Sequence, residues 1–298
     1  MYNFTIIIPH KNIPELLQRC LDSIPQREDL QVIIVDDNSA ADVVDFTNFV
    51  GLKRPNTEII FSKGEKGKGP GFARNLGLSK ANGKWIIFLD ADDYFNTCFN
   101  EALDHYQNAK EEIVFFKCSM QNEVGETNPN YPLINDAMDR SIQTGNPEGL
   151  IYGVPCPWAK FIKRNFLEEN GIRYQEITGG DDILFSIRMA LKLKSYLFSD
   201  DHLYCVVDRP GSLTRNNKWR GFYSYVLACC EAFGLLKTVS KENLAVGWVT
   251  AWWGFLWAEN GIVALTLVPT IYYTMGVRNA SRCLKKGIKQ GAWNWRNK

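Results

Sequence analysis

Three carboxylates crowd into four positions after one apolar run, and they are the residues of this sequence best suited to chemistry. The run spans residues 85–89 and reads W-I-I-F-L, with Asp90, Asp92 and Asp93 directly after it. A continuous apolar run of this length is typical of a central strand covered on both faces. Because side chains alternate along an extended chain, we expect Asp90 and Asp92 on one side and Asp93 turned away.

Carboxylates this close repel one another at neutral pH unless a cation or a hydrogen-bond donor lies between them. Proteins hold Mg²⁺ and Mn²⁺ with one or two carboxylates plus substrate phosphates. The spacing therefore predicts a divalent metal site that serves a diphosphate, built from Asp90, Asp92 and Asp93. The alternative is an acidic turn that caps the next helix, since aspartate is a favoured N-cap residue.

Two further pairs of aspartates stand at element ends. Asp36 and Asp37 follow a predicted strand at 31–35, where a doubly wound sheet often bonds a nucleotide base or ribose. Asp181 and Asp182 precede an apolar helical pattern, and the helix dipole would keep a carboxylate ionised there. Helix capping is the alternative for each pair.

The elements that would position these residues alternate between strand and helix. Strands are expected at 4–8, 31–35, 58–61, 85–89 and 113–116, with helices at 12–24, 72–78, 99–107 and from 181 onward. Asn12 and Glu15 have the spacing of a capping box at the first helix. This order predicts an α/β fold with a mostly parallel sheet. Residues 122–149 are rich in Asn, Pro, Gly and Thr and are expected to form a long loop or lid.

A glycine- and lysine-rich loop at 63–71 precedes the helix at 72–78. Its backbone could approach phosphate oxygens closely, and the helix N-terminus attracts anions. The spacing does not match a Rossmann fingerprint, and the first strand ends in Pro9 instead of glycines.

Composition limits the class of protein. The chain has 298 residues, 45% hydrophobic and 22% charged, with a net charge of +1. These values are ordinary for a globular protein, and nucleic acid is not an expected partner. Eight scattered cysteines without a C-x-x-C pair indicate free thiols in a reducing cytosol. The first strand begins at Phe4, which leaves no room for a signal peptide, so we expect a cytoplasmic protein.

These motifs, taken together, resemble the family 2 glycosyltransferases with the GT-A fold, over residues 4 to 215. The segments that carry the resemblance are the opening strand 6–9, the strand end 35–39, the helix 73–78, the D-x-D motif at 88–93, the W-x-K segment at 157–160, the G-D-D-x-x-F segment at 180–185 and the loop 209–214. The family more often has Glu where this chain has Asp181.

The resemblance implies a Rossmann-like GT-A domain at 1–215 and an inverting transfer from a nucleoside diphosphate sugar, with a UDP-sugar favoured. It implies that Pro9 and Asp37 lie near the base, Asp90 lies near the ribose, and Mn²⁺ or Mg²⁺ binds at 90–93. Asp182 would be the catalytic base, with Asp181 among the substrate-binding residues. The acceptor would be a hydroxyl of a glycan or a lipid-linked glycan.

Three further side chains have two interpretations each. Arg74 and Arg209 could bind phosphate or form surface ion pairs. Trp158 could stack on an acceptor sugar or belong to the core. A sugar nucleotidyltransferase and a non-catalytic nucleotide-sugar-binding homologue are the alternative functions, although the first would need glycines directly after the first strand.

The C-terminal part, residues 216–298, has a different composition. Four tryptophans and a phenylalanine occur within 248–257, and residues 278–298 hold seven Lys or Arg and no acid. Neither apolar half of this region has the features of a transmembrane span. Two interpretations remain, a helical extension docked on the domain and a peripheral contact with the cytoplasmic face of the inner membrane.

Overall fold

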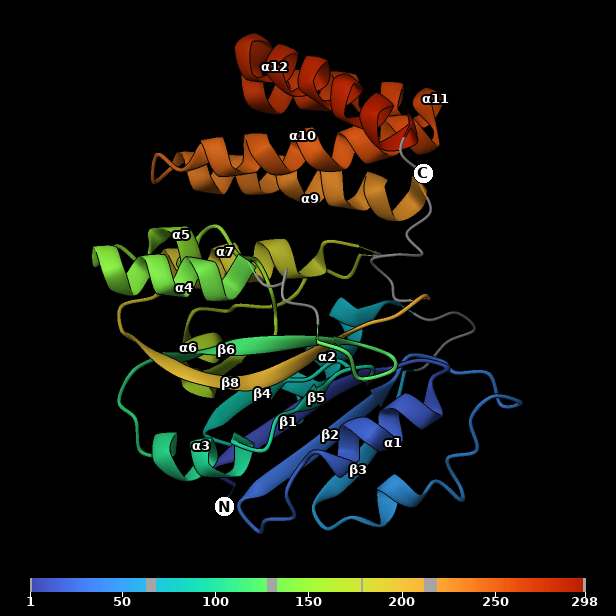
Figure 1. Cartoon of the computed structure of the whole chain (residues 1–298), viewed down its shortest axis with the longest axis vertical. Coiled ribbons are helices and arrows are strands. Elements are labelled where there is room, and N and C mark those ends of the chain that lie inside the picture. The colour runs from blue at the N-terminus through green and yellow to red at the C-terminus, as the bar shows by residue number, and fades with distance from the viewer. Residues whose placement is uncertain (1, 63–67, 128–132, 178, 212–218, 297–298) are drawn as a thin grey trace.

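A computed structural model describes residues 2–62, 68–127, 133–177, 179–211 and 219–296, the last seven of these by backbone alone. Its centre is one eight-stranded sheet in the order β3-β2-β1-β4-β7-β6-β8-β5. The strands are β1 (Phe4–His10), β2 (Leu30–Asp36), β3 (Thr57–Phe61), β4 (Trp85–Phe88), β5 (Tyr94–Phe95), β6 (Ile113–Asn122), β7 (Lys160–Lys163) and β8 (Tyr196–Asp208). Helices flank the sheet, and a stack of helices stands at one end of the molecule (Figure 1).

The helices follow the strands in the order expected of an α/β chain. They are α1 (Pro14–Asp22), η1 (Val50–Lys53), α2 (Pro70–Leu78), α3 (Phe99–Tyr106), α4 (Leu133–Thr144), α5 (Glu148–Ile151), α6 (Arg164–Glu169), α7 (Asp181–Lys192), α9 (Trp219–Lys237), α10 (Glu242–Glu259), α11 (Gly261–Thr266) and α12 (Val268–Arg296). All the strands predicted from the sequence are present.

The pairing brings several carboxyl ends of strands to one edge of the sheet. β1 pairs in parallel with β2 and β4, β2 with β3, and β6 with β8, whereas β7 and β5 run antiparallel to their neighbours. The ends of β1, β2, β4, β6 and β8 therefore face the same way, which is where open α/β sheets bind ligands. The predicted mostly parallel sheet is confirmed.

Two local predictions were wrong. Asn12 does not cap α1, because its backbone has φ 57° and its side-chain oxygen accepts the Ala40 N–H at 2.8 Å. The helix begins at Pro14 without a side-chain cap. Much of the loop expected at 122–149 is helical, since Ile134, Ala137, Met138 and Ser141 of α4 are buried at helical spacing.

The C-terminal helices share a second core with α7. Ile183, Leu184 and Ile187 on one face of α7 pack with buried residues of α9, α10 and α12, separately from the main core around the sheet. In Figure 1 these helices stack in layers above α7. The expected boundary at 215/216 falls within 212–218, outside the described residues. None of the described helices is both long and apolar enough to cross a bilayer.

Candidate functional site

The turn after β4 presents its three aspartates differently. Asp93 is 5% exposed, and its two carboxylate oxygens accept the Tyr204 hydroxyl at 2.6 Å and the Val207 N–H at 2.8 Å. Tyr204 also accepts the Asp90 N–H at 3.1 Å, so one tyrosine of β8 bonds both ends of the turn. Burial, with the charges of Asp92 and Asp90 added, raises the pKa of Asp93 well above its usual range. No helix starts at this turn, and β5 follows it instead.

A buried arginine joins the turn to α7. Arg74 of α2 is 5% exposed and donates to Asp90 Oδ1 at 2.6 Å and to Asp181 Oδ2 at 2.7 Å. Its guanidinium also lies over the Tyr174 ring, 5.3 Å from the centroid. Burial opposes the charged form, but the two aspartates outweigh it and raise the pKa of Arg74. The surface ion pair considered for Arg74 is therefore a buried bridge between two parts of the site.

Asp182 sits beside this bridge without joining it. It occupies the first turn of α7, after Gly180 in the left-handed region at φ 79°. Burial, and then the charge of Asp181, raises the pKa of the Asp182 carboxyl to about 7. Within the described residues, no side chain donates a hydrogen bond to this carboxylate. A half-buried carboxyl with a pKa near neutrality is suited to general-base chemistry.

Arg209 contacts the remaining aspartate of the turn. It follows β8, and its Nε and one terminal nitrogen lie 2.9 and 2.8 Å from Asp92 Oδ2. Both side chains keep some exposure, 13% for Arg209 and 22% for Asp92. Burial and the charge of Asp90 raise the pKa of Asp92, while Arg209 opposes that rise. Residues 212–214 of the expected loop motif lie outside the described part of the chain.

Hydrogen bonds to Asp36 and Asp37 fix the ends of β1 and β2 at the same edge of the sheet. Asp37 accepts the N–H groups of Lys68 and Gly69 at 2.7 and 2.9 Å, and thereby ties β2 to the start of α2. Asp36 is bonded to His10 Nδ1 at 2.9 Å, next to Pro9 in β1. Nothing in a lone histidine after Pro9 indicates this bond, so the sequence alone predicts no role for His10.

At Gly69 and Gly71, in the segment 63–71, the structure leaves no room for a larger residue or requires a positive φ. Gly69 has φ 93°, and a Cβ on Gly71 would lie 2.0 Å from the Gln175 carbonyl oxygen. Glycine is therefore required at both positions, by the backbone conformation at Gly69 and by the close approach of residues 175–177. Residues 63–67, which the prediction placed near phosphate, lie outside the described residues.

Trp158 contacts Tyr204, the tyrosine that bonds the turn after β4. It is half-buried and stacks on Tyr204 with 5.2 Å between ring centroids and 17° between planes. Lys160, two positions later, is buried and donates to the Cys156 carbonyl at 2.7 Å. A cavity of about 440 Å³ opens at the ends of β6 and β8, and its lining includes Arg19, Tyr94, Gln121 and Val207.

The C-terminal helices reach the residues just before Asp181. A Cβ on Gly180 would lie 2.8 Å from the ring of Tyr225 of α9, and one on Gly179 would lie 3.0 Å from it. Tyr225 in turn stacks on Trp252 of α10 with 4.0 Å between centroids. No sequence motif pointed to Tyr225 or Tyr204, because each acts through a contact distant in the chain.

The sequence and the fold both match known glycosyltransferases. The profile of "Glycosyl transferase family 2" matches residues 5–171, more than half of the chain. The poly(ribitol-phosphate) beta-glucosyltransferase of Bacillus spizizenii is 31% identical over 70% of this chain and 32% of its own length. The cholesterol galactosyltransferase of Borreliella burgdorferi is 26% identical over 72% of this chain and 62% of its own. The chain thus spans between about a third and three fifths of these relatives.

Among solved structures, residues 1–349 of Staphylococcus aureus TarS in complex with UDP-GlcNAc superpose with a TM-score of 0.68 at 19% identity, over 99% of this chain and 90% of that one. The mannosyltransferase PcManGT from Pyrobaculum calidifontis, in complex with GDP-Man and Mn²⁺, gives a TM-score of 0.57 at 16% identity, over 98% of this chain and 87% of that one. These likenesses confirm the GT-A fold expected from the sequence. With the profile match over more than half its length, the chain belongs to glycosyl transferase family 2.

Proposed function

We propose that this protein is an inverting glycosyltransferase that moves a sugar from a nucleoside diphosphate sugar to a hydroxyl of a glycan or lipid-linked glycan. The observation that carries the proposal is Asp182, a carboxylate with a pKa of about 7 that no side chain of the described residues bonds, held beside the Arg74 bridge at the ligand-binding edge. A UDP-sugar is favoured as donor because TarS, whose fold this chain shares, was solved with UDP-GlcNAc.

The donor would lie across the β1, β2 and β4 ends. Pro9 and Asp37 stand where the base would bind, and Asp90 stands where the ribose would bind, as the family motifs imply. The bonds of Asp36 to His10 and of Asp37 to the start of α2 fix the shape of this half. We propose that Arg74 and Asp181 fix the position of Asp90 relative to the start of α7, since both terminal nitrogens of Arg74 are already bonded to carboxylates.

The residues present fit a divalent cation that is shared with the diphosphate. Among the described residues no cluster of three or more His, Cys, Asp or Glu could hold a metal alone, but Mg²⁺ and Mn²⁺ need only one or two carboxylates when phosphates complete the shell. Asp92 fits this role because it is partly exposed and already faces a cation, Arg209. Asp90 would be the second ligand, and Asp93 the third if it releases Tyr204 or Val207.

Bound there, the ion would stabilise the negative charge that develops on the leaving diphosphate. Arg209, displaced from Asp92, would be free to pair with a phosphate oxygen. Exchange of this kind costs little, because the Arg209–Asp92 pair is partly exposed.

Asp182 would take the proton of the acceptor hydroxyl as its oxygen attacks the anomeric carbon. The bond from that carbon to the diphosphate oxygen breaks on the opposite face, so the anomeric configuration inverts. Trp158 would line the acceptor side, with the face not stacked on Tyr204 turned to the sugar. The cavity beside Tyr94 and Gln121 would hold a further part of the acceptor.

We also propose that the enzyme works in the cytoplasm, in peripheral contact with the cytoplasmic membrane face, as a lipid-linked acceptor would require. Residues 1–215 would form the transferase domain and 216–298 its helical extension.

The test is release of nucleoside diphosphate from a panel of UDP-, GDP- and dTDP-sugars with Mn²⁺ or Mg²⁺, for the native chain and for Asp92→Ala. We expect metal-dependent release from one donor, lost in the variant. Metal-dependent donor binding with no release under any acceptor supplied would favour a non-catalytic homologue. Formation of a sugar nucleotide from a nucleoside triphosphate and a sugar phosphate would favour a nucleotidyltransferase.

A further inference from the structure

The helices α11 and α12 expose apolar side chains to solvent in a regular order. Their buried residues recur at helical spacing and face the second core; they are Ala264, Leu267, Ile271 and Met275. Exposed apolar residues alternate with them in the sequence, namely Ile262, Leu265, Pro269 and Tyr273, with Val277 directly after Gly276; we call these five the apolar stripe. The exposed fractions reach 81% for Ile262 and 93% for Tyr273. Large apolar side chains gathered this way mark contact sites.

A row of exposed basic residues lies in the second segment of α12, after a break in the helix at Gly276, where φ is 73°. Arg278, Arg282, Lys285 and Lys289 are all exposed and recur at spacings of four, three and four, which places them on one helix face. We call these four residues the basic stripe. Buried Ala280, Cys283 and Gly287 define the face turned to the second core.

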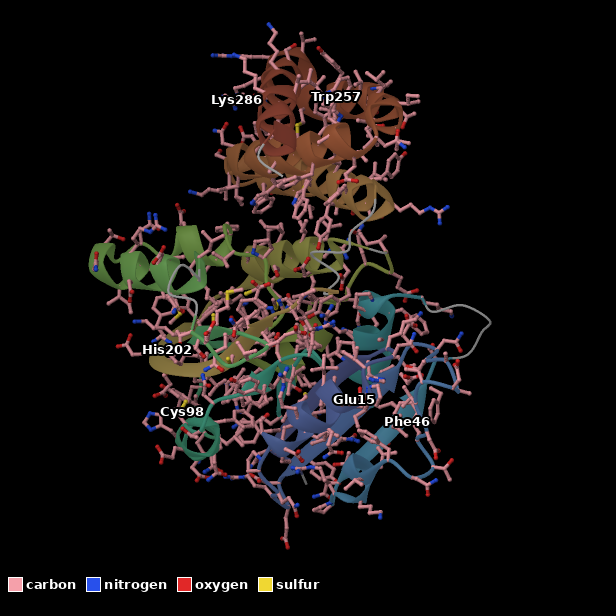
Figure 2. All side chains as sticks on the ribbon, turned by 45° about the vertical axis from the view of Figure 1, so that its right-hand side comes forward. Glu15, Phe46, Cys98, His202, Trp257 and Lys286 are labelled. Atoms are coloured by element: carbon pink, nitrogen blue, oxygen red, sulfur yellow. The ribbon has the colours of Figure 1, made fainter. Side chains whose placement is uncertain are left out.

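The charge of this surface is one-sided. Residues 260–298 contain seven Lys or Arg and no Asp or Glu. Within the described part of the chain, no residue of the basic stripe forms an ion pair, and Arg282 donates only to Asn243 Oδ1, at 3.2 Å. Figure 2 shows Lys286, a neighbour of the stripe, at the end of the molecule away from Glu15 and Phe46.

We infer that the apolar and basic stripes of α11 and α12 dock this protein onto a bilayer rich in anionic phospholipid. Exposed apolar side chains and an exposed basic row on consecutive helical segments match the boundary between lipid chains and negatively charged headgroups. α9 packs against α7 and α10 packs against α9, so α11 and α12 lie at the outer end of the stack, away from the sheet (Figure 1). The inference names the surface and the lipid charge for the membrane contact proposed above, and it can be tested without measuring sugar transfer.

The test is sedimentation of the full chain with vesicles of phosphatidylcholine alone and with about 30% phosphatidylglycerol added. We expect at least about tenfold stronger binding to the anionic vesicles, weakened by added salt because exposed charges are screened. Equal binding to both vesicles, or binding to neither, would overturn the inference.

Two variants locate the surface. Arg278→Glu/Lys285→Glu/Lys289→Glu and Ile262→Ser/Tyr273→Ser should each weaken binding to anionic vesicles by about tenfold or more. The matched control is Lys53→Glu/Lys80→Glu/Lys110→Glu, which makes the same charge change at exposed positions of the other half of the molecule. It should keep binding within about twofold of the native chain. Equal loss in the control would show a nonspecific charge effect and overturn the inference.

The same samples separate this surface from a protein interface. Sedimentation velocity without lipid should give one species whose size is unchanged by Ile262→Ser/Tyr273→Ser. A dimer that this variant dissociates, in a chain that does not bind vesicles, would assign the stripes to a second copy and contradict the inference. If vesicle binding holds but no donor turns over, the proposed transferase activity fails while this inference stands.

Discussion

Two arginines contact the aspartates that follow β4, and their surroundings differ. Arg74 is buried and bridges Asp90 to Asp181, whereas Arg209 meets Asp92 at a partly exposed edge. Removing one partner of a buried pair leaves a charge without compensation, but a partly exposed pair can exchange its partner at a smaller cost. The first contact therefore holds the shape of the site, and the second lies where we propose that metal and diphosphate enter.

The same contrast separates two neighbouring aspartates of α7. Asp181 is bonded to Arg74, while Asp182 has no side-chain donor among the described residues. The proposed base is thus the aspartate that lies outside the Arg74 bridge.

The largest effect is expected from Asp182→Asn. An amide cannot accept the acceptor's proton, so the transfer rate should fall by about 10²- to 10⁴-fold, with donor binding and thermal stability nearly unchanged. Steady-state kinetics and donor titration on the same samples measure the two quantities. Asp181→Asn is the control, and its main effect should be on stability, because it weakens the bridge to Arg74. A rate near the native value in Asp182→Asn would remove the base from the mechanism.

Arg74→Met should be the most destabilising of these substitutions. It leaves Asp90 and Asp181 close together without their shared cation, and loss of one partner from a buried ion pair costs about 3–5 kcal/mol of unfolding free energy. Arg209→Met is the matched control at the partly exposed pair, with a smaller expected cost of about 1 kcal/mol. Urea denaturation of both variants measures the difference. Similar costs in the two variants would erase the distinction between the arginines.

Gly180→Ala should have an intermediate effect. The left-handed backbone at φ 79° and the Tyr225 ring 2.8 Å from the added Cβ both oppose an L side chain. We expect a stability loss larger than the about 1–2 kcal/mol of left-handed backbone strain alone, with reduced turnover because α7 begins at the next residue. Gly171→Ala, also at positive φ but with open space around it, is the control for backbone strain alone. Equal losses in the two would show that Tyr225 does not constrain this turn.

Arg209→Met should change stability least and donor use more clearly. If Arg209 pairs with the diphosphate once the metal binds, its loss should raise KM for the donor by about tenfold, the equivalent of one charge-assisted hydrogen bond. Initial rates at saturating Mn²⁺ measure the change. An unaltered KM would show that Arg209 does not bind the donor diphosphate and contacts only Asp92 in this role.

The strands of the sheet and the clusters of candidate site residues could be predicted from the sequence, because both depend on local patterns. The apolar run before Asp90 and the helical periodicity after Asp182 are visible in single segments. The contacts that distinguish the aspartates are not, since Tyr204 and Arg209 lie more than a hundred positions from the turn that they contact. The capping box at Asn12 failed for the same reason, because Ala40 competes for its side chain.

The C-terminal extension shows another limit. Its aromatic residues indicated either a core or a membrane surface, and the sequence alone does not show which of these residues are buried and which are exposed. The structure places Trp253 at 1% exposure in the second core and Tyr273 almost fully in solvent. Composition alone cannot assign these faces, because the kink at Gly276 and the docking on α7 set them.

The central claim is that Asp182 is the base, and the pH dependence of kcat/KM for donor turnover tests it most directly. Burial and the charge of Asp181 raise the pKa of this carboxyl to about 7, so a base there is lost by protonation as the pH falls. For the native chain we predict a rate that drops about tenfold per pH unit below about 7, and for Asp182→Asn a low rate without that limb. The same limb in the variant, or a native rate that is flat from pH 8 to about pH 5, would contradict the account.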